Sequence, residues 1–382
     1  MSKKIYLDNA STTPVEEEVL EEMTPYFNQK FGNPSSIHKF GQEARVAIDQ
    51  SREKVAGFLN CDPKEVVFTG SATEANNIFI QGVIEKHDNP HVITSAIEHD
   101  AVLETVKNSK AEVTVLSVDE NGFIDLKELE EKIKENTVLV TIMYANNEIG
   151  TVQPVKEVVN LIKDKNKERD QRIYFHTDAA QAAGYLNCNL EDLAVDGFTM
   201  SGHKIYGPKG VGVLFKKRDV NIDPIIFGGG QEDGIRSGTY NTPLIVGMSK
   251  AVELIEGKKK RKETENLRDY LIEEVLKIEE ASLNGPKEDR LPNNANFSFE
   301  GVEGESIVMI LDQENIATST GSACSSNSLE PSHVLRAIGL GDLAAHSSLR
   351  VSVGRETTKK DIDKFLEELK KTIKRLREIS GR

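Results

Sequence analysis

The sequence predicts an α/β protein with a mostly parallel, seven-stranded sheet, flanking helices and a smaller α+β domain toward the C-terminal end. Two observations carry this prediction. Apolar strand-like runs alternate with helical patterns over the first two-thirds of the 382 residues. Beyond about residue 255, the alternation gives way to long helices and short strands. Strand–helix alternation is typical of a parallel sheet covered by helices on both faces.

Seven short apolar runs are the expected strands of the sheet, since their length is that of buried strands. In chain order they are Glu65–Thr69, His91–Ser95, Glu112–Ser117, Thr137–Tyr144, Arg172–Thr177, Gly197–Ser201 and Gly212–Phe215. The helical patterns between them include Ser35–Leu59, Ala72–Lys86, Asp125–Glu135 and Pro154–Lys165.

The C-terminal third has a different organisation. A charged helical stretch is expected from Lys250 to about Glu279. Short strands follow at Asn296–Phe299 and Leu349–Val353, and the amphipathic pattern Lys359–Ile379 predicts a final helix. We therefore predict a large domain of residues 14–255 and a small domain formed by residues 1–13 and 256–382. The small domain contains a loop at about 317–332.

Composition excludes several classes of protein. Hydrophobic residues make up 38% and charged residues 29%, as in ordinary globular proteins. The net charge of −14 argues against general binding to nucleic acids or membrane surfaces, which are themselves anionic. The basic run Lys258–Lys262 is interpreted as a solvated helix face, with a local basic patch as the alternative. No secretory signal core and no run of 18 apolar residues occurs, so a cytoplasmic protein is expected.

The three cysteines differ in their surroundings. Cys61, Cys188 and Cys324 are widely spaced and form no CxxC pair, which argues against a disulfide framework and an autonomous zinc site. Cys61 and Cys188 follow hydrophobic runs and are expected to be structural. Cys324 lies in the Gly/Ser-rich stretch 319–328, which predicts a mobile loop carrying a reactive thiol.

Polar residues follow five of the predicted strands, where ligands gather in open α/β sheets. They are Thr69 onward, Glu98-His99, Asn146-Asn147, Asp178 and Ser201 to Lys204. Lys204 could be a Schiff-base lysine or an ordinary loop lysine. Asp178, 26 residues earlier, could hold the pyridine nitrogen of pyridoxal phosphate (PLP) or cap a helix. The Gly/Ser/Thr turn at 70–73 could bind a phosphate or simply begin a helix.

Seven motifs together resemble NifS/IscS-type cysteine desulfurases, which belong to the class V aminotransferase group of fold-type I PLP enzymes. They are SATEANN, EHDAV, NNEIGTVQP, HTDAAQ, SGHKIYGPKG, GGGQEDGIRSGT and STGSACSSNSLEPSHVL. The resemblance extends from Tyr6 to Arg355 in the order found in the family. It implies PLP as the cofactor and a homodimer as the active form.

The resemblance also implies roles for individual residues. Lys204 would bind PLP covalently and move the Cα proton, Asp178 would pair with the pyridine nitrogen, and His99 would lie over the ring. Asn147 and Gln181 would bind the phenolic oxygen of the cofactor. Its phosphate would be bound by Ala72, Thr73, Ser201 and His203. Thr239 of the partner subunit would bind the same phosphate.

An arginine in a predicted strand is the candidate for substrate binding. A guanidinium in a strand is costly unless it is paired, and its planar fork suits a carboxylate. By the resemblance, Arg350 binds the α-carboxylate of L-cysteine with Asn33 as a helper. Arg355 is the nearby alternative.

Cys324 decides which reaction is expected. The resemblance implies that its thiolate takes sulfur from L-cysteine, leaving L-alanine and a Cys324 persulfide. The sulfur would pass to an iron–sulfur scaffold protein or another acceptor. No metal site is expected in the chain itself, although Cys324 could transiently ligate a cluster shared with the scaffold. Two alternatives stay open: a class V aminotransferase or PLP lyase, which would not need Cys324, and an inactive scaffold subunit.

Overall fold

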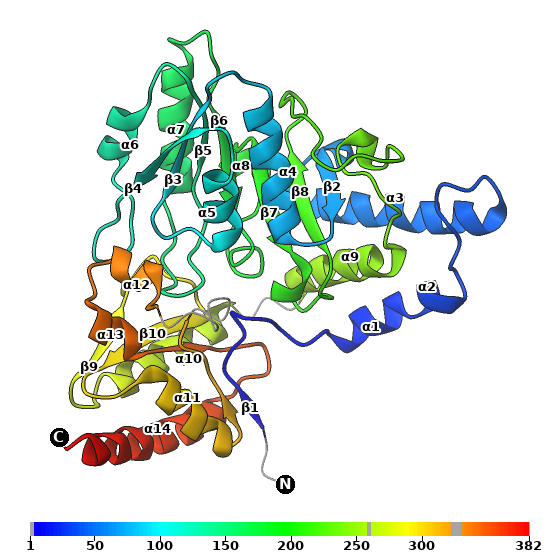
Figure 1. Ribbon diagram of the computed structural model, residues 1–382. Coiled ribbons are helices and arrows are strands. Elements are labelled where there is room, and N and C mark those ends of the chain that lie inside the picture. Colours follow the sequence, from blue (N-terminus) through cyan, green and yellow to red (C-terminus); the bar gives the residue numbers. More distant parts are fainter. Residues whose placement is uncertain (1–3, 258–260, 322–329, 382) are drawn as a thin grey trace.

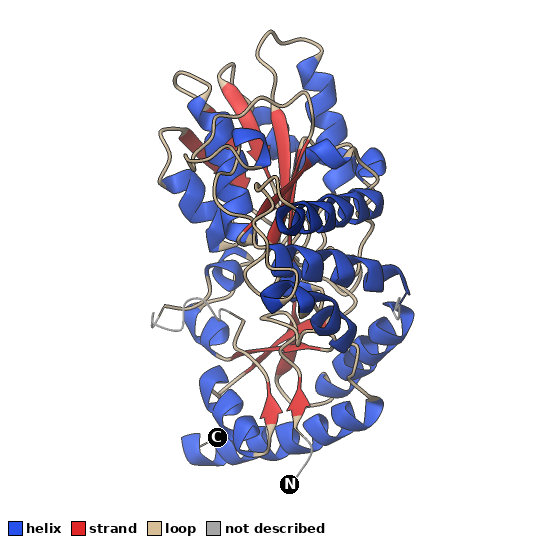
Figure 2. Cartoon of the chain, turned by 90° about the vertical axis from the view of Figure 1, so that its right-hand side faces the viewer, coloured by secondary structure: helices blue, strands red, loops and turns tan. Residues whose placement is uncertain are grey.

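The computed structural model describes residues 4–257, 261–321 and 330–381. Two bodies are stacked along the molecule, each with its own sheet and its own apolar core (Figures 1 and 2). The larger body contains the seven-stranded sheet, and the smaller body contains a three-stranded sheet. The candidate site lies where the two bodies meet.

The large sheet has the strand order β2-β8-β7-β6-β5-β3-β4. Its strands are β2 (Val66–Thr69), β3 (His91–Ser95), β4 (Glu112–Leu116), β5 (Thr137–Thr141), β6 (Tyr174–Asp178), β7 (Gly197–Ser201) and β8 (Gly212–Lys216). β8 runs antiparallel to both of its neighbours, and the other pairings are parallel. The mostly parallel sheet predicted from the sequence is therefore confirmed, and the carboxyl ends of six strands share one edge.

Helices cover both faces of this sheet. In the large body they are α1 (Glu17–Met23), α2 (Pro25–Asn28), α3 (Lys39–Leu59), α4 (Ala72–Glu85), α5 (Asp100–Lys107), α6 (Leu126–Lys132), α7 (Val155–Asn166), α8 (Leu190–Leu193) and α9 (Thr242–Gly257). Phe79 of α4 and Val102 of α5 pack on one face. Ile48 of α3, Val158 of α7 and Met248 of α9 pack on the other. Each face buries alternate residues of the strands, as the period of two requires.

The smaller body is built mainly from the C-terminal third of the chain. Its elements are α10 (Arg261–Val275), β9 (Ala281–Asn284), β10 (Asn294–Phe299), α11 (Gly304–Gln313), β11 (Ile316–Ala317), α12 (His333–Ala337), α13 (Asp342–His346), β12 (Ser348–Ser352) and α14 (Lys359–Ser380). The antiparallel sheet has the order β12-β10-β9. The N-terminal strand β1 (Ile5–Tyr6) pairs in parallel with β11, so the start of the chain packs with this body.

Two predicted helices differ in their bounds. The stretch predicted as one helix from Lys250 to Glu279 contains α9 and α10, which lie on either side of residues outside the described ranges; α9 begins earlier, at Thr242, and α10 ends at Val275. The helix predicted from Ser35 begins at Lys39, because the preceding residues form a turn in which Asn33 Oδ1 accepts the Ser35 N–H at 2.9 Å. Residues 258–260 of the basic run lie outside the described residues, and Lys262 is exposed on α10.

No helix in the described parts of the chain is long and apolar enough to cross a membrane.

Candidate active site

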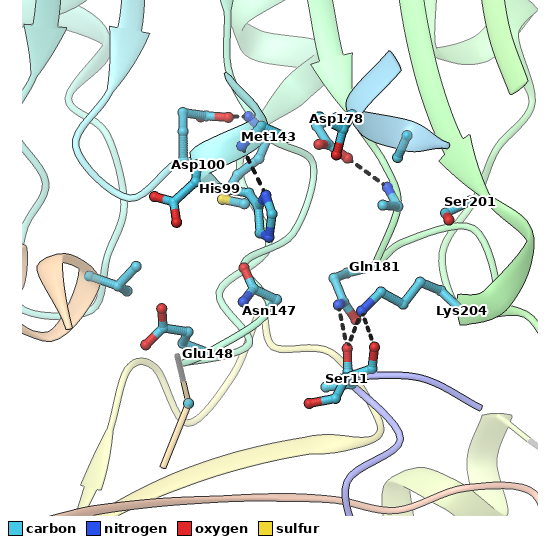
Figure 3. Close-up of a pocket in the computed structure, with 18 of the residues that line it drawn as sticks. Ser11, His99, Asp100, Met143, Asn147, Glu148, Asp178, Gln181, Ser201 and Lys204 are labelled. Carbon is cyan, nitrogen blue, oxygen red and sulfur yellow. Dashed lines mark hydrogen bonds between the residues drawn. The ribbon is translucent and has the colours of Figure 1, made fainter. Parts of the chain in front are cut away.

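A cavity of about 530 Å³ opens at the carboxyl edge of the large sheet, where the smaller body faces it (Figure 3). Of the predicted site residues, ten line this cavity. They are Ala72, Thr73, His99, Asn147, Asp178, Gln181, Ser201, His203, Lys204 and Arg350. They come from six separate stretches of the sequence, and the strand ends bring them together.

Lys204 reaches into the cavity from the short 3-10 turn Gly202–Lys204 that follows β7. Its Nζ donates to the backbone oxygens of Ala10 and Ser11, at 2.5 and 2.8 Å. Gln181 donates from Nε2 to the same oxygen of Ala10 at 2.9 Å. The N-terminal segment therefore lies against Lys204 and Gln181 (Figure 3).

Asp178 ends strand β6 and is buried at 6% exposure. One carboxylate oxygen accepts the side-chain N–H of Asn76 at 2.7 Å, and the other accepts the backbone N–H of Ala180 at 2.9 Å. The second bond caps a turn, whereas the alternative left open from the sequence was a helix cap. The first is a tertiary contact with helix α4 across the base of the cavity.

His99 is the residue that caps helix α5. Its Nδ1 accepts the backbone N–H of Ala101 at 3.0 Å. Figure 3 shows the ring extending from this cap toward Asn147. The capping bond fixes the orientation of the ring within the cavity.

The first turn of α4 lies at another side of the cavity. Ser71 caps the helix by accepting the Glu74 N–H at 3.1 Å, and Ser71, Ala72 and Thr73 all line the cavity. Amide groups in the first turn of a helix lack intrahelical partners, so they suit an anion. Ser201 and His203 line the same cavity. Burial, followed by the charges of Lys204 and Lys209, lowers the pKa of His203 to about 4.

Arg350 lies in β12 and is 2% exposed. Its Nη2 donates to Asp8 Oδ1 at 2.8 Å and to Ser11 Oγ at 2.6 Å. Its Nη1 donates to the backbone oxygens of Asn147 and Gly321, at 3.1 and 2.9 Å. Arg350 is thus the cation at the small-body side of the cavity.

The alternative arginine lies elsewhere. Arg355 pairs with Glu16 at 2.9 Å and lies over the ring of Tyr206, and neither Arg355 nor Glu16 lines the cavity.

Two predicted site residues are not in this cavity. Asn33 and Thr239 are both exposed and line a separate hollow of about 350 Å³. Large exposed apolar side chains, Phe27, Phe31 and Phe40, lie in the segments that precede and begin α3. Within one chain, therefore, Asn33 and Thr239 lie together but apart from Lys204.

Cys324 lies outside the described residues. Gly321 and Glu330, on either side of that gap, line the cavity. The other two cysteines have the structural surroundings expected. Cys188 is buried, and burial raises the pKa of the partly buried Cys61 thiol to about 12.

Two buried carboxyl groups in the cavity wall were given no role from the sequence. Glu98 Oε1 accepts from Ser95 Oγ and from the Met143 N–H, and burial raises the pKa of Glu98 to about 8. Glu148 accepts from Ser332 Oγ at 2.6 Å, and burial raises its pKa as well.

The segment from Asp8 to Ser11 was also missed as part of the site. The sequence signals for it were the arginine in a predicted strand, which is costly unless paired, and the family resemblance, which begins at Tyr6. Within the described ranges, no group of three or more His, Cys, Asp or Glu side chains could hold a metal ion.

Comparisons with known proteins give one consistent result. The model of the aminotransferase class-V family matches residues 5–365. The cysteine desulfurase IscS of Dictyoglomus turgidum is 47% identical, with 100% of this chain and 97% of the relative aligned. The enzyme of the same name from Methanosarcina thermophila is 45% identical over 99% of this chain and 94% of its own length.

Solved structures agree. A NifS-like protein superposes with a TM-score of 0.90 at 38% identity, covering 97% of this chain and 99% of that one. SspA in complex with cysteine has a TM-score of 0.81 at 38% identity, covering 93% and 100%.

Proposed function

The chain belongs to the aminotransferase class-V family, and we propose that it is a PLP-dependent cysteine desulfurase that converts L-cysteine to L-alanine and retains the sulfur as a persulfide. Full-length relatives named cysteine desulfurase at 45–47% identity support the reaction. The observation that carries the proposal is the convergence of Lys204, Asp178 and His99 on one cavity.

The groups around the cavity fit PLP. A carboxylate, a lysine amine and a helix N-terminus lie on its walls, which are the partners needed by a pyridine nitrogen, an aldehyde and a phosphate. When bound, PLP supplies an electron sink that makes the substrate Cα proton acidic and the bond from Cβ to sulfur labile.

The residues of the chain then have separate tasks. Lys204 would hold the cofactor covalently and would afterwards move the proton at the substrate Cα. Asp178 keeps a proton on the ring nitrogen, and its two neutral partners, Asn76 and the Ala180 N–H, leave its charge available for that purpose. His99 would lie over the ring, and Asn147 and Gln181 would donate to the phenolic oxygen.

The phosphate is held by Ala72 and Thr73 at the start of α4, together with Ser201 and His203. Since Thr239 is exposed and lies outside the cavity of its own chain, it is available to a second copy. We propose a homodimer in which Thr239 completes the phosphate site of the partner subunit. The exposed phenylalanines near Asn33 support a covered surface there.

The substrate is anchored through its α-carboxylate by Arg350, assisted by Asn33. A solved relative in complex with cysteine supports an amino-acid site in this fold. Cys324 accepts the substrate sulfur. Its thiol loses a proton before attack, because the thiolate is the nucleophile.

The domain bounds, the sulfur acceptor and the location in the cell are proposed from the same family resemblance. The large domain spans residues 14–255, and residues 1–13 with 256–382 form the small domain that bears Cys324. The sulfur passes to an iron–sulfur scaffold protein or another acceptor, and the enzyme works in the cytoplasm.

A single-turnover experiment tests the function. The purified, PLP-loaded protein is mixed with L-cysteine without reductant, and its thiols are trapped and mapped by mass spectrometry. One added sulfur on Cys324 with about one alanine released per chain is expected. Alanine formation that persists in Cys324→Ser would instead favour a PLP lyase. A protein that stays colourless with PLP would indicate a scaffold subunit.

A further inference from the structure

Arg350 has no vacant hydrogen-bonding face for a second carboxylate. A guanidinium has five N–H donors. Nη1 and Nη2 each make two hydrogen bonds, to Asn147, Gly321, Asp8 and Ser11. The remaining donor, Nε, is buried and has no partner. A bidentate carboxylate can therefore bind only if existing contacts break.

Charge decides which contacts break. If a substrate carboxylate replaced the two backbone oxygens on Nη1, it and Asp8 would place two anions on one guanidinium in a buried site, which is costly. If it replaced Asp8 and Ser11 on Nη2, one carboxylate would substitute for another and the charge would stay balanced.

The side chain of Asp8 can move away from the Arg350 guanidinium. This side chain is 18% exposed, so it can regain water, whereas the side chain of Arg350 is 2% exposed and cannot. Glu148, another carboxyl that lines the cavity, accepts from Ser332 Oγ rather than from the guanidinium. Without substrate, Arg350 needs a counter-ion to remain buried, and Asp8 supplies it.

We propose that Asp8 is an exchangeable counter-ion of Arg350, which the α-carboxylate of the amino-acid substrate displaces. This inference rests on the proposed role of Arg350 in substrate binding. It makes Asp8 a determinant of affinity, because each binding event must first break the pair of Asp8 and Arg350.

Ser11 links this exchange to the lysine. Its Oγ donates to Asp8 Oδ1 at 2.8 Å and accepts from Arg350. Its backbone oxygen accepts from Lys204 Nζ. A lysine that holds PLP covalently would have fewer N–H donors for Ala10 and Ser11, so cofactor loading would remove part of what holds this segment, while Gln181 and Ser352 would still bind Ala10.

Binding measurements on the PLP-loaded protein test the exchange. The ligands are L-serine, which has no transferable sulfur, and ethanolamine, which lacks the carboxylate. Affinity is measured by calorimetry and by the visible absorbance of the cofactor. Asp8→Asn keeps the shape and removes the charge. Ser11→Ala removes only the supporting hydroxyl. Glu16→Gln is the matched control, because it neutralises the partner of Arg355 outside the cavity.

Asp8→Asn is expected to bind L-serine about five- to tenfold more tightly, as loss of a charged hydrogen bond would allow, with ethanolamine unchanged. Ser11→Ala should shift affinity in the same direction by less, and Glu16→Gln should match wild type. A crystal structure with L-serine should show the ligand carboxylate on Nη2 and Asp8 turned away.

Weaker or unchanged serine binding by Asp8→Asn would overturn the exchange, and so would an intact pair of Asp8 and Arg350 beside bound serine. If the wild-type protein bound PLP but no amino acid, the proposed function would fall as well. The two failures are therefore distinguishable.

Discussion

The Nδ1 atom of His99 accepts the backbone N–H of Ala101 at 3.0 Å, so the side chain that faces the cavity also caps helix α5. A nitrogen that accepts a hydrogen bond carries no proton. In the neutral ring the proton must therefore be on Nε2, and His99 presents a donor to the cavity.

This tautomer can be measured directly. In nitrogen NMR spectra of the protein labelled at histidine, His99 is expected to show the Nε2–H form, with the signal assigned by its loss in His99→Gln. A proton on Nδ1 in the neutral protein would mean that the cap is broken in solution.

Asp178→Asn should bind PLP but turn over L-cysteine at least about a hundredfold more slowly, because a neutral amide cannot keep the ring nitrogen protonated. The absorbance of the bound cofactor checks loading, and alanine release checks the rate. A control is Asp192→Asn, on the surface side of α8, which should match wild type. Near-normal turnover by Asp178→Asn would remove the assigned role.

Glu98 should make the protein less stable as the pH rises. Its pKa is raised by burial from 4.5 to about 8, so between these values the folded protein keeps a proton that the unfolded chain has lost. The free energy of unfolding therefore falls with rising pH in this window. Glu98→Gln cannot lose a proton, and its melting temperature relative to wild type should rise between pH 5 and about pH 8. A constant difference across the window would contradict the assignment.

His176 should have the opposite effect. Its ring nitrogens lie 2.9 and 3.1 Å from the hydroxyls of Thr141 and Thr199, and burial lowers its pKa from 6.5 to about 3. Below 6.5 the unfolded chain binds a proton that the folded protein cannot accept, so stability falls with falling pH. His176→Gln should have a free energy of unfolding about 1–3 kcal/mol lower than wild type at neutral pH. Between pH 6.5 and pH 4, however, its free energy of unfolding should fall by less than that of wild type, as measured by urea titrations. Equal slopes in the two proteins would refute this.

Mixed dimers should reveal whether Thr239 acts on the partner subunit. Lys204→Ala and Thr239→Ala are each expected to impair the homodimer. In a mixed dimer, one site would combine Lys204 of one chain with Thr239 of the other, so activity should reappear on mixing. A mixture no more active than its components would place Thr239 outside the partner's site or exclude subunit exchange. Co-expression with two affinity tags separates these cases.

Much of the fold was predictable because buried strands leave a strong local signal. All seven predicted strands of the large sheet are present, with ends shifted by up to three residues. β5 ends at Thr141 rather than Tyr144, because the Met143 N–H bonds to the side chain of Glu98 instead of to a neighbouring strand. Such a tertiary contact has no signature in the apolar pattern.

The predicted site residues came from two sources, the polar residues at strand ends and the family resemblance. Asp8 and Glu148 were missed because their partners, Arg350 and Ser332, lie 342 and 184 residues away. The roles assigned to Cys324, Asn33 and Thr239 stay predictions. The first lies outside the described residues, and the other two lie outside the cavity of their own chain.

The parallel pairing of β1 with β11 has a consequence for biosynthesis. Ile5 pairs with Ile316, so the first strand to be synthesised cannot form its pairing until residue 316, late in the chain, has been made. At about 5–20 residues per second this delay is roughly 15–60 s. The last strand of the large sheet, β8, ends at Lys216, so only during about the last third of this delay can all of its strands pair with one another, while Asp8 has no arginine to contact. The nascent protein therefore has an interval in which its cofactor pocket is built from the large sheet alone.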